Sequence, residues 1–288
     1  MCRREELNRA LQFDYIAVGH VTVDVLEDGS RRPGGTALYA ALQAARLGLQ
    51  ALILTRGAPA EIESMLEPWA GELELRVQPA AATTTLATSG QGAERSQRLL
   101  AWAGPIVTEE ELECAILHLA PVAAELPERW PRGGRLLGLT AQGLARGHPA
   151  PGGVLRAAAP DAATLAQADR ADVVVISEQE RGVCAELIER ARAAGALIAV
   201  TDGGRPSTIL APGGTPIELA VHQLGSPADD LGAGDVYAAA LFTALAEGRG
   251  PAQAGSLANT AAAMRMRGLG PNAIAERAEI EARLQQAC

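Results

Sequence analysis

Short, mostly apolar runs alternate with stretches of helical character along most of the chain. Such runs, ending at glycine or a polar residue, are typical of buried strands, and the longer stretches between them are typical of helices. The expected strands are 14–19, 51–55, 114–119, 135–140, 172–177, 196–201, 208–211 and 216–220, and the expected helices are 38–47, 60–69, 178–194, 232–247, 251–267 and 275–286. This alternation indicates an α/β fold with a mostly parallel sheet.

Two segments have an alternating or polar pattern instead. In 72–77, charged residues alternate with apolar ones, which is typical of an edge or half-exposed strand. Segment 83–100 is polar and rich in β-forming residues around a glycine-containing turn at 89–92. We expect it to form a hairpin whose outer face carries Arg95 and Arg98.

The expected elements belong to one unit. A length of 288 residues would allow about two domains. The Pro- and Gly-rich stretch 147–153 is too short for an interdomain linker, and the sequence contains no repeat of about 20 to 50 residues. We therefore expect a single domain over residues 1–288, with a small lid or hairpin element around 83–100.

The charged residues exclude several classes of protein. The chain has 25 basic residues, all of them arginine, against 34 acidic residues, for a net charge of −9. Without lysine there is no Schiff-base or pyridoxal phosphate chemistry and no Walker A loop. A net negative charge without a basic tract also lacks the electrostatic attraction on which sequence-independent nucleic-acid binding depends. Nucleic acid is therefore not an expected partner.

The cysteines and histidines are scattered along the chain. No CxxC or HExxH pattern links them, so the sequence predicts neither a disulfide framework nor a zinc site. The first residues are charged, and no later segment approaches the roughly 18 apolar residues that span a membrane. We therefore expect reduced thiols, a cytoplasmic protein and no membrane partner. The residues concerned are Cys2, Cys114, Cys184, Cys288, His20, His118, His148 and His222.

The segment 229–235, with the sequence DDLGAGD, is the strongest chemical signal. A turn of small residues leading into a helix exposes backbone N–H groups that have no helical partner, so a phosphoryl group can bind there. Asp235 would repel that group unless it takes a proton from an attacking hydroxyl. The pairing indicates phosphoryl transfer. The alternative is that Asp235 only stabilises the first helical turn and the glycines only form a tight turn.

This segment resembles the Asp-Thr-x-Gly-Ala-Gly-Asp signature of the ribokinase-like (PfkB) carbohydrate kinases. The resemblance extends over nearly the whole chain and implies a three-layer α/β/α fold with a mostly parallel central sheet and a reduced β lid. It also implies that Gly232, Ala233 and Gly234 form an anion hole and that Asp235 is the catalytic base. Asp230 stands in place of the family's threonine. Its negative charge near the donor phosphates requires a metal ion, an arginine or a different nucleotide geometry to offset it.

The same resemblance implies an acceptor site near the start of the chain. Asp24 matches the family's substrate-binding aspartate, and Gly34 and Gly35 match the di-glycine that contacts the sugar. A carboxylate accepts hydrogen bonds from two neighbouring hydroxyls, whereas the alternative for Asp24 is a turn or cap. Only nine residues separate Asp24 from Gly34, so the lid insertion shrinks to at most a minimal hairpin around 28–29. Residues 36–37 lack the asparagine common in ribokinases, so ribose specificity is not carried over.

The segment 177–180 resembles the family's Asn-x-x-Glu motif, with Ser177 in place of the asparagine. The resemblance implies that Glu180 organises Mg²⁺ and phosphate through bound water. A glutamate in the first turn of a helix also interacts favourably with the helix dipole, so a purely structural role is the alternative.

A later stretch with the sequence TDGGRPS resembles the family's nucleotide-binding Thr-x-Gly-x-x-Gly segment. The resemblance implies that Thr201, Gly203 and Gly204 line the nucleotide. Pro206 occupies the second glycine position, so the local backbone must differ. Asn259 falls where the family places a helix along the adenine pocket.

Arginines are the only side chains that can take the place of the missing lysine. The pair Arg95 and Arg98, together with the threonines at 83–85 and the motif QGLAR that ends at Arg146, resembles the branch of the family that contains inositol 3-kinases. One of these arginines would neutralise the transferring phosphoryl group, since guanidinium binds phosphate oxygens bidentately. The alternative is that they are solvated surface residues.

These motifs together predict an ATP-dependent kinase that uses Mg²⁺ and transfers the γ-phosphoryl group to a hydroxyl of a sugar or polyol, inositol included. The alternative is a weak or inactive relative that binds a sugar, polyol or nucleotide in a regulatory role, as the departures at Asp230, Ser177 and Pro206 would allow. A dinucleotide-dependent dehydrogenase is a poor match because no GxGxxG follows the first strand. The expected partner is a small molecule, and the sequence leaves open whether the chain is a monomer or a homodimer formed through the 83–100 hairpin.

Overall fold

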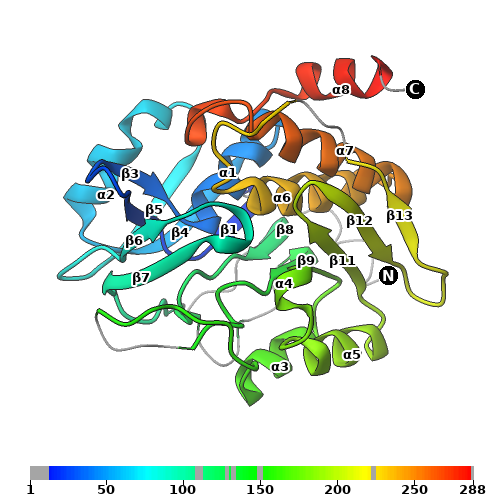
Figure 1. Cartoon of the computed structure of the whole chain (residues 1–288), viewed down its shortest axis with the longest axis horizontal. Helices are drawn as coiled ribbons and strands as arrows, with labels where there is room; N and C mark the ends of the chain where they lie inside the picture. Colours follow the sequence, from blue (N-terminus) through cyan, green and yellow to red (C-terminus); the bar gives the residue numbers. More distant parts are fainter. Residues whose placement is uncertain are drawn as a thin grey trace, which may run out of the picture.

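A nine-stranded sheet separates two layers of helices (Figure 1). In this computed structural model the described residues are 13–107, 113–126, 130, 134–147, 152–221 and 225–286. In spatial order the strands are β13 (Ile217–Leu219), β12 (Arg205–Leu210), β11 (Leu197–Asp202), β10 (Val173–Ser177), β9 (Gly134–Thr140), β8 (Cys114–Leu119), β1 (Phe13–Val18), β4 (Ala51–Gly57) and β5 (Glu74–Pro79). Neighbours from β5 to β11 are parallel, whereas β12 and β13 add antiparallel pairings. The expected α/β fold with a mostly parallel sheet is confirmed.

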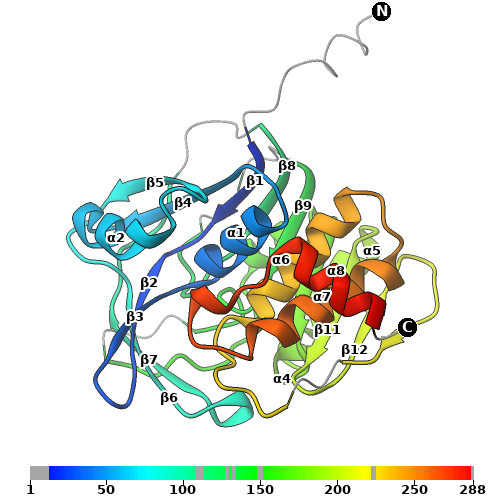
Figure 2. The same cartoon turned by 90° about the horizontal axis from the view of Figure 1, so that it is seen from above.

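Helices from the two ends of the chain cover one face of this sheet, and helices from its middle cover the other (Figures 1 and 2). The first face carries α1 (Thr36–Arg46), α2 (Pro59–Leu66), α6 (Ala233–Ala246), α7 (Pro251–Arg265) and α8 (Arg277–Gln286). The second face carries α3 (Ala162–Ala168) and α5 (Ala185–Ala193), while the short α4 (Glu178–Arg181) directly follows β10. Each helical layer therefore closes its own apolar core against the sheet.

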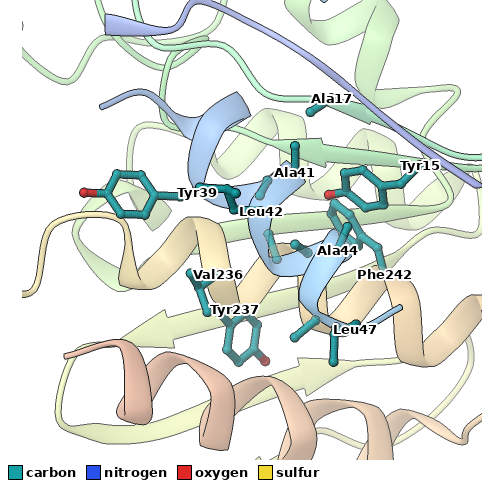
Figure 3. Close-up of a cluster of buried hydrophobic side chains, with 14 of the residues drawn as sticks. Tyr15, Ala17, Tyr39, Ala41, Leu42, Ala44, Leu47, Val236, Tyr237 and Phe242 are labelled. Carbon is teal, nitrogen blue, oxygen red and sulfur yellow. The ribbon is translucent and has the colours of Figure 1, made fainter. Parts of the chain in front are cut away.

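The core under α1 and α6 brings side chains of β1 and both helices together (Figure 3). Tyr15, Leu42 and Phe242 are each at most 1% exposed, and full burial of a side chain of this kind contributes about 1.5–3 kcal/mol. A Cβ atom at Gly138 of β9 would lie 2.3 Å from the ring of Phe242. Glycine at this strand position therefore lets α6 pack directly on the sheet.

A separate four-stranded sheet, the lid, is built from two hairpins that are distant in sequence (Figure 2). Its order is β3 (Arg31–Gly34), β2 (Thr22–Val25), β6 (Thr85–Ser89) and β7 (Ser96–Ala101). The first hairpin turns at Asp28 and Gly29, where the Ser30 amide donates to Asp28 Oδ1 (2.9 Å) and Gly29 has a φ of 78°. The minimal hairpin expected around 28–29 is therefore present, and it pairs with the expected 83–100 hairpin through parallel β2 and β6.

Two elements differ from the sequence prediction. The helix expected over 178–194 is divided into α4 and α5, because glycine and a β-branched residue at 182–183 are weak helix formers. Helix α3 was not predicted, and it begins at Asp161, whose side chain accepts a hydrogen bond from the Thr164 amide (2.8 Å). Four of the scattered residues considered above, Cys2, His148, His222 and Cys288, lie outside the described residues.

The two described cysteines, Cys114 and Cys184, are buried and form no disulfide bond within the described part of the chain. Burial raises the pKa of each thiol to about 12, so neither is ionised at neutral pH and neither is a nucleophile. Among the described helices, none has the length and apolar character needed to cross a membrane.

Candidate active site

A cavity of about 740 Å³ opens at the carboxyl ends of β9, β10 and β11, between the lid and the N-terminus of α6. Ligands of open α/β folds bind at this end of the strands. Of the site residues proposed from the sequence, Gly34 does not line the cavity; those that do are Asp24, Gly35, Glu180, Thr201, Gly203, Gly204, Gly232, Ala233, Gly234, Asp235 and Asn259. The structure therefore brings together segments that are up to 235 residues apart (Asp24 and Asn259).

The turn before α6 has the conformation needed to present backbone amides to the cavity. Gly232 is the N-cap of α6 and adopts the left-handed conformation with a φ of 83°, and a Cβ atom there would lie 2.4 Å from the ring of Tyr39. The amides of Gly234 and Asp235 belong to the first helical turn, so they have no acceptor within the helix. The turn therefore offers unpaired N–H groups and the positive end of a helix dipole to an anion.

Asp235 follows these amides on the first turn of α6 and faces the cavity. Burial raises the pKa of its carboxyl to about 6, and the negative charge of Glu180 acts in the same direction. A hydrogen bond from Thr36 and the positive charges of Arg146 and Arg95 oppose the shift in pKa. A carboxylate with a pKa near 6 is ionised at neutral pH and is a stronger base than an ordinary aspartate.

Asp24 lies on β2 of the lid and lines the cavity. Its side chain is 2% exposed, burial raises its pKa to about 6, and Thr22 Oγ1 donates a hydrogen bond to its Oδ1 (3.1 Å). A Cβ atom at Gly34 would lie 2.1 Å from Asp24 Oδ2, and one at Gly35 would lie 2.2 Å from the carbonyl oxygen of His20. Gly34 therefore makes room for the Asp24 carboxylate, while Gly35 lets the backbone reach the cavity.

Glu180 has both a structural and a cavity-facing role. Its Oε2 accepts hydrogen bonds from the backbone amide (3.0 Å) and the hydroxyl (2.8 Å) of Ser177, which forms a capping box at the start of α4. Glu180 also lines the cavity. No group of three or more His, Cys, Asp or Glu side chains converges on a metal position in the described residues. Of the carboxylates that line the cavity, Glu180 is the one that would hold Mg²⁺ through bound water, because Mg²⁺ retains several waters and binds donor phosphates as well.

The nucleotide-binding segment expected after β11 forms a tight turn. Gly203 and Gly204 connect β11 to β12, with Asp202 paired to Arg205 across the turn and Gly203 at a φ of 57°. The Arg205 guanidinium also bonds to the Asp202 carboxylate (Nε to Oδ2, 2.7 Å). Thr201 Oγ1 donates to the carbonyl of Ile176 (3.3 Å), which fixes it between two strands at the edge of the cavity.

Beyond this turn the cavity wall becomes apolar. Asn259 of α7 donates from Nδ2 to the carbonyl oxygens of Leu219 (3.3 Å) and Ala220 (3.2 Å), so its amide holds the end of β13 against α7. The wall beside it is lined by Val221, Pro227, Ala262, Ala263 and Met266. A flat, largely apolar group fits against such side chains better than a phosphate does.

The loop that leads into the Gly232 turn is held by a buried arginine that the sequence prediction missed. Arg265 of α7 is 0% exposed and donates to the carboxylate of Asp229 (3.0 Å) and to the carbonyl of Leu231 (2.6 Å), with its guanidinium 5.1 Å from the centre of the Tyr39 ring. Asp229 also accepts from the amides of Leu231 (2.9 Å) and Gly270 (3.0 Å). No local motif signals these contacts, because Arg265 lies 34 residues after Leu231 in the sequence.

Asp230 is offset by an arginine of the lid. The guanidinium of Arg95 forms an ion pair with Asp230, and the Gly92 amide donates to the same carboxylate (2.8 Å). Of the three ways considered for offsetting Asp230, the structure contains the arginine. The expectation that Arg95 lies on the outer face of the hairpin is wrong: it precedes β7 and turns toward the cavity, whereas Arg98 within β7 is exposed as expected.

No protein-family model and no curated protein matches this sequence. Solved structures match over nearly the whole chain. A pyrophosphate-dependent kinase in the ribokinase family, complexed with a pyrophosphate analogue and myo-inositol, matches with a TM-score of 0.78 at 21% identity, covering 93% of this chain and 99% of that chain. Ribokinase of Arabidopsis thaliana, complexed with ribose and ATP, has a TM-score of 0.71 at 16% identity and coverages of 95% and 99%. The Methanocaldococcus jannaschii nucleoside kinase has a TM-score of 0.73 at 17% identity and coverages of 96% and 100%.

Proposed function

We propose, from the ribokinase fold that this chain has, that it is a kinase that transfers a phosphoryl group to a hydroxyl of a small sugar or polyol. The observation that carries the proposal is the position of Asp235, beside unpaired amides at the N-terminus of α6 and in the same cavity as Asp24. The amides suit a phosphoryl group. A carboxylate beside that group is useful if it takes the proton of the attacking hydroxyl.

Each group at the site has a distinct role in this reaction. Asp24 accepts hydrogen bonds from acceptor hydroxyls, and Asp235 takes the proton of the hydroxyl whose oxygen attacks phosphorus. The unpaired amides of Gly234 and Asp235 stabilise the charge on the phosphoryl oxygens. General base catalysis contributes about 10²–10⁴-fold to rate, and one donor to a developing charge about 10²–10³-fold.

ATP is the donor that the shape of the cavity favours. The cavity continues from the 232–234 turn past Gly203 and Gly204 to the apolar wall of α7, which suits a nucleoside base. Thr201 and Asn259 lie along the same side. Mg²⁺, held through water by Glu180, would supply positive charge to the donor phosphates.

Pyrophosphate is the second candidate donor. It is favoured because pyrophosphate-dependent kinases are among the structures that match this chain, at 20% and 21% identity. One of these is described as a myo-inositol kinase, and another is complexed with myo-inositol, so an inositol is among the acceptors to be tested. The two donors differ in whether the apolar wall is used.

The test is acceptor-dependent turnover across a panel of sugars, inositols and nucleosides, with Mg²⁺ and either ATP or pyrophosphate as donor. We expect product formation by the unchanged protein, and a loss of about 10²–10⁴-fold in kcat for Asp235→Asn, because the base is removed. The matched control is Asp169→Asn, an exposed acid paired with Arg190 on α5, which should leave kcat unchanged.

Two outcomes would contradict the proposal. If Asp235→Asn keeps full turnover, Asp235 is not the base. If no acceptor gives turnover with either donor while a sugar, polyol or nucleotide raises the melting temperature, the chain is instead a binding protein with a regulatory role. We propose that the activity is cytoplasmic, which is consistent with two buried cysteines that form no disulfide bond in the described residues.

A further inference from the structure

The cavity contains four arginines and, like the rest of the chain, no lysine. Arg205 forms an ion pair with Asp202 at the far turn, and Arg267 lies beyond the apolar wall. Arg95 and Arg146, which we call the arginine pair, are the two whose charge lowers the pKa of Asp235. Of the cations in the cavity, these two therefore act most strongly on Asp235, the proposed base.

Arg146 is a partly exposed cation of the cavity wall. It lies in the loop after β9 and donates from Nη1 to the carbonyl of Val122 (3.4 Å). Within the described ranges no carboxylate forms an ion pair with it, although Glu180 and Asp235 lie near enough to raise its pKa against the effect of burial. A partly buried guanidinium without an ion partner is costly, and an incoming anion would remove that cost.

An ion pair with Asp230, in the loop before α6, holds Arg95 in place. Its pairing with Asp230, together with the bond from the Gly92 amide to the same carboxylate, ties the tip of the β6–β7 hairpin to the loop before α6. The side chains of Arg95 and Asp230 are each 19% exposed. The Nε atom of Arg95 is buried and has no hydrogen-bond partner in the described part of the chain. One donor of this guanidinium therefore remains free.

We propose that Arg146 and Arg95 bind the oxygens of the transferring phosphoryl group together with the unpaired amides at the N-terminus of α6, and that Asp230 is the residue that positions Arg95. The proposal rests on the proposed function. In the step, the bond from the acceptor oxygen to phosphorus forms, the bond from phosphorus to the donor's leaving oxygen breaks, and the hydroxyl proton goes to Asp235. Both guanidinium groups stay protonated throughout and lower the energy of the charge on the phosphoryl oxygens.

This assignment explains why an acid is tolerated beside a phosphate site. Asp230 alone would repel the donor, but paired with Arg95 it adds no net charge and fixes a flexible side chain. A preformed guanidinium loses less conformational freedom on binding phosphate than a free one. The two arginines of the arginine pair thus supply the positive charge that a lysine supplies in other phosphoryl-transfer sites.

The first experiment compares Arg146→Gln and Arg95→Gln with Arg98→Gln, an exposed residue of β7 that does not line the cavity. We expect kcat to fall about 10²-fold or more for the first two, with a smaller change in KM for the acceptor. Affinity for pyrophosphate alone, measured by calorimetry, should fall at least about tenfold for them, as for the loss of one charge-assisted contact. Arg98→Gln should match the unchanged protein in both measurements.

A second set of variants separates binding from folding. Arg146→Lys keeps the charge but loses the bidentate geometry, so it should retain the melting temperature and recover only part of the lost kcat. Asp230→Thr should lower kcat in the unchanged protein but not in an Arg95→Gln background, because its effect acts through Arg95. Hydrogen exchange in 85–101 should also increase in Asp230→Thr, since the tie to the hairpin tip is lost.

The outcomes distinguish this inference from the proposed function. Suppose that the unchanged protein turns over substrate and that Arg146→Gln keeps both its kcat and its pyrophosphate affinity. The proposed role of the arginine pair is then wrong, while the proposed kinase activity is supported. If no donor gives turnover but pyrophosphate affinity falls in Arg146→Gln and not in Arg98→Gln, the anion site stands and the kinase does not. Equal effects of Asp230→Thr with and without Arg95 would overturn the positioning role of Asp230.

Discussion

At the scale of single residues, burial sets the chemistry of the two acids in the cavity. It raises the pKa of Asp24 and of Asp235 to about 6. Arg95 and Arg146 lower the pKa of both acids, and Asp235 also raises that of Asp24. The balance leaves both ionised at neutral pH, as the roles proposed for them require.

The pH dependence of turnover follows from the direction of this shift. Because Asp235 acts as a base only when it is ionised, kcat/KM for the acceptor should be constant above about pH 7 and fall about tenfold or more for each unit below pH 6. The rate profile of the unchanged protein, with its melting temperature measured at each pH, checks this. A profile that stays flat to pH 5 while the protein remains folded would argue against a base with a pKa near 6.

Residues in local motifs could be predicted from the sequence, whereas pairings across the fold could not. Asp24 and Asp235 were proposed from short patterns that end a strand or begin a helix, and the structure places both in one cavity. The partner of Asp230 could not be identified from pattern, because Arg95 lies 135 residues earlier. The contacts of Arg265 could not be predicted either, since nothing in the sequence of an alanine-rich helix indicates that its arginine is buried.

At the scale of elements, the conformation of the turn before α6 depends on side chains of α1 and α7. Tyr39 of α1 occupies the space next to Gly232, and Arg265 of α7, which contacts the Tyr39 ring, bonds to Asp229 and Leu231. The turn therefore takes its shape from two helices that pack against α6 as well as from its own sequence.

Gly232→Ala tests this dependence. The substitution places a Cβ atom 2.4 Å from the Tyr39 ring at a φ of 83°, so we expect the free energy of unfolding to fall by more than the roughly 1–3 kcal/mol that backbone strain alone costs, and kcat to fall as well. Gly248→Ala is the matched control, because its φ is 84° but nothing lies within 4 Å of its Cβ position. It carries the backbone strain without the clash, so similar losses in both variants would show that Tyr39 is not what fixes the turn.

The strands and helices of the main sheet were predictable because their patterns are local. Every strand expected in the central sheet is present, and 72–77 forms the edge strand β5. The break at 182–183 and the short α3 were not predicted, because a side-chain cap and a turn between helices change the apolar pattern very little. The ribokinase-like fold implied by the motifs is confirmed by the structural comparisons.

At the scale of the whole molecule, the site lowers the stability of the fold. The raised pKa of Asp24 means that the folded chain binds its proton more tightly than the unfolded chain, so stability falls as pH rises from about 4 to 6 and remains lower above that range. The cost at pH 7 is at most about 3 kcal/mol. The buried carboxylate of Asp24 therefore lowers the stability of the fold, and its proposed role in binding the acceptor accounts for its presence.

Asp24→Asn should accordingly stabilise the protein at pH 7 by about 1–3 kcal/mol while it weakens acceptor binding. Urea unfolding of both proteins at pH 7 measures the difference in the free energy of unfolding. At pH 4 the folded chain already holds Asp24 protonated, so the same comparison should give little or no difference. A variant that is less stable at pH 7 would mean that Thr22 and the nearby arginines more than offset the burial of the charge.

The lid has an architecture that bears on how substrate preference can be changed. Its two hairpins leave the main sheet at different points of the chain and meet along the β2–β6 pairing. A chimera that exchanges only one hairpin would join mismatched strands and leave backbone groups at the junction unpaired. Laboratory evolution toward a new acceptor would therefore replace both hairpins together. It could also proceed by single substitutions on the inner face of the lid that leave the β2–β6 pairing unchanged.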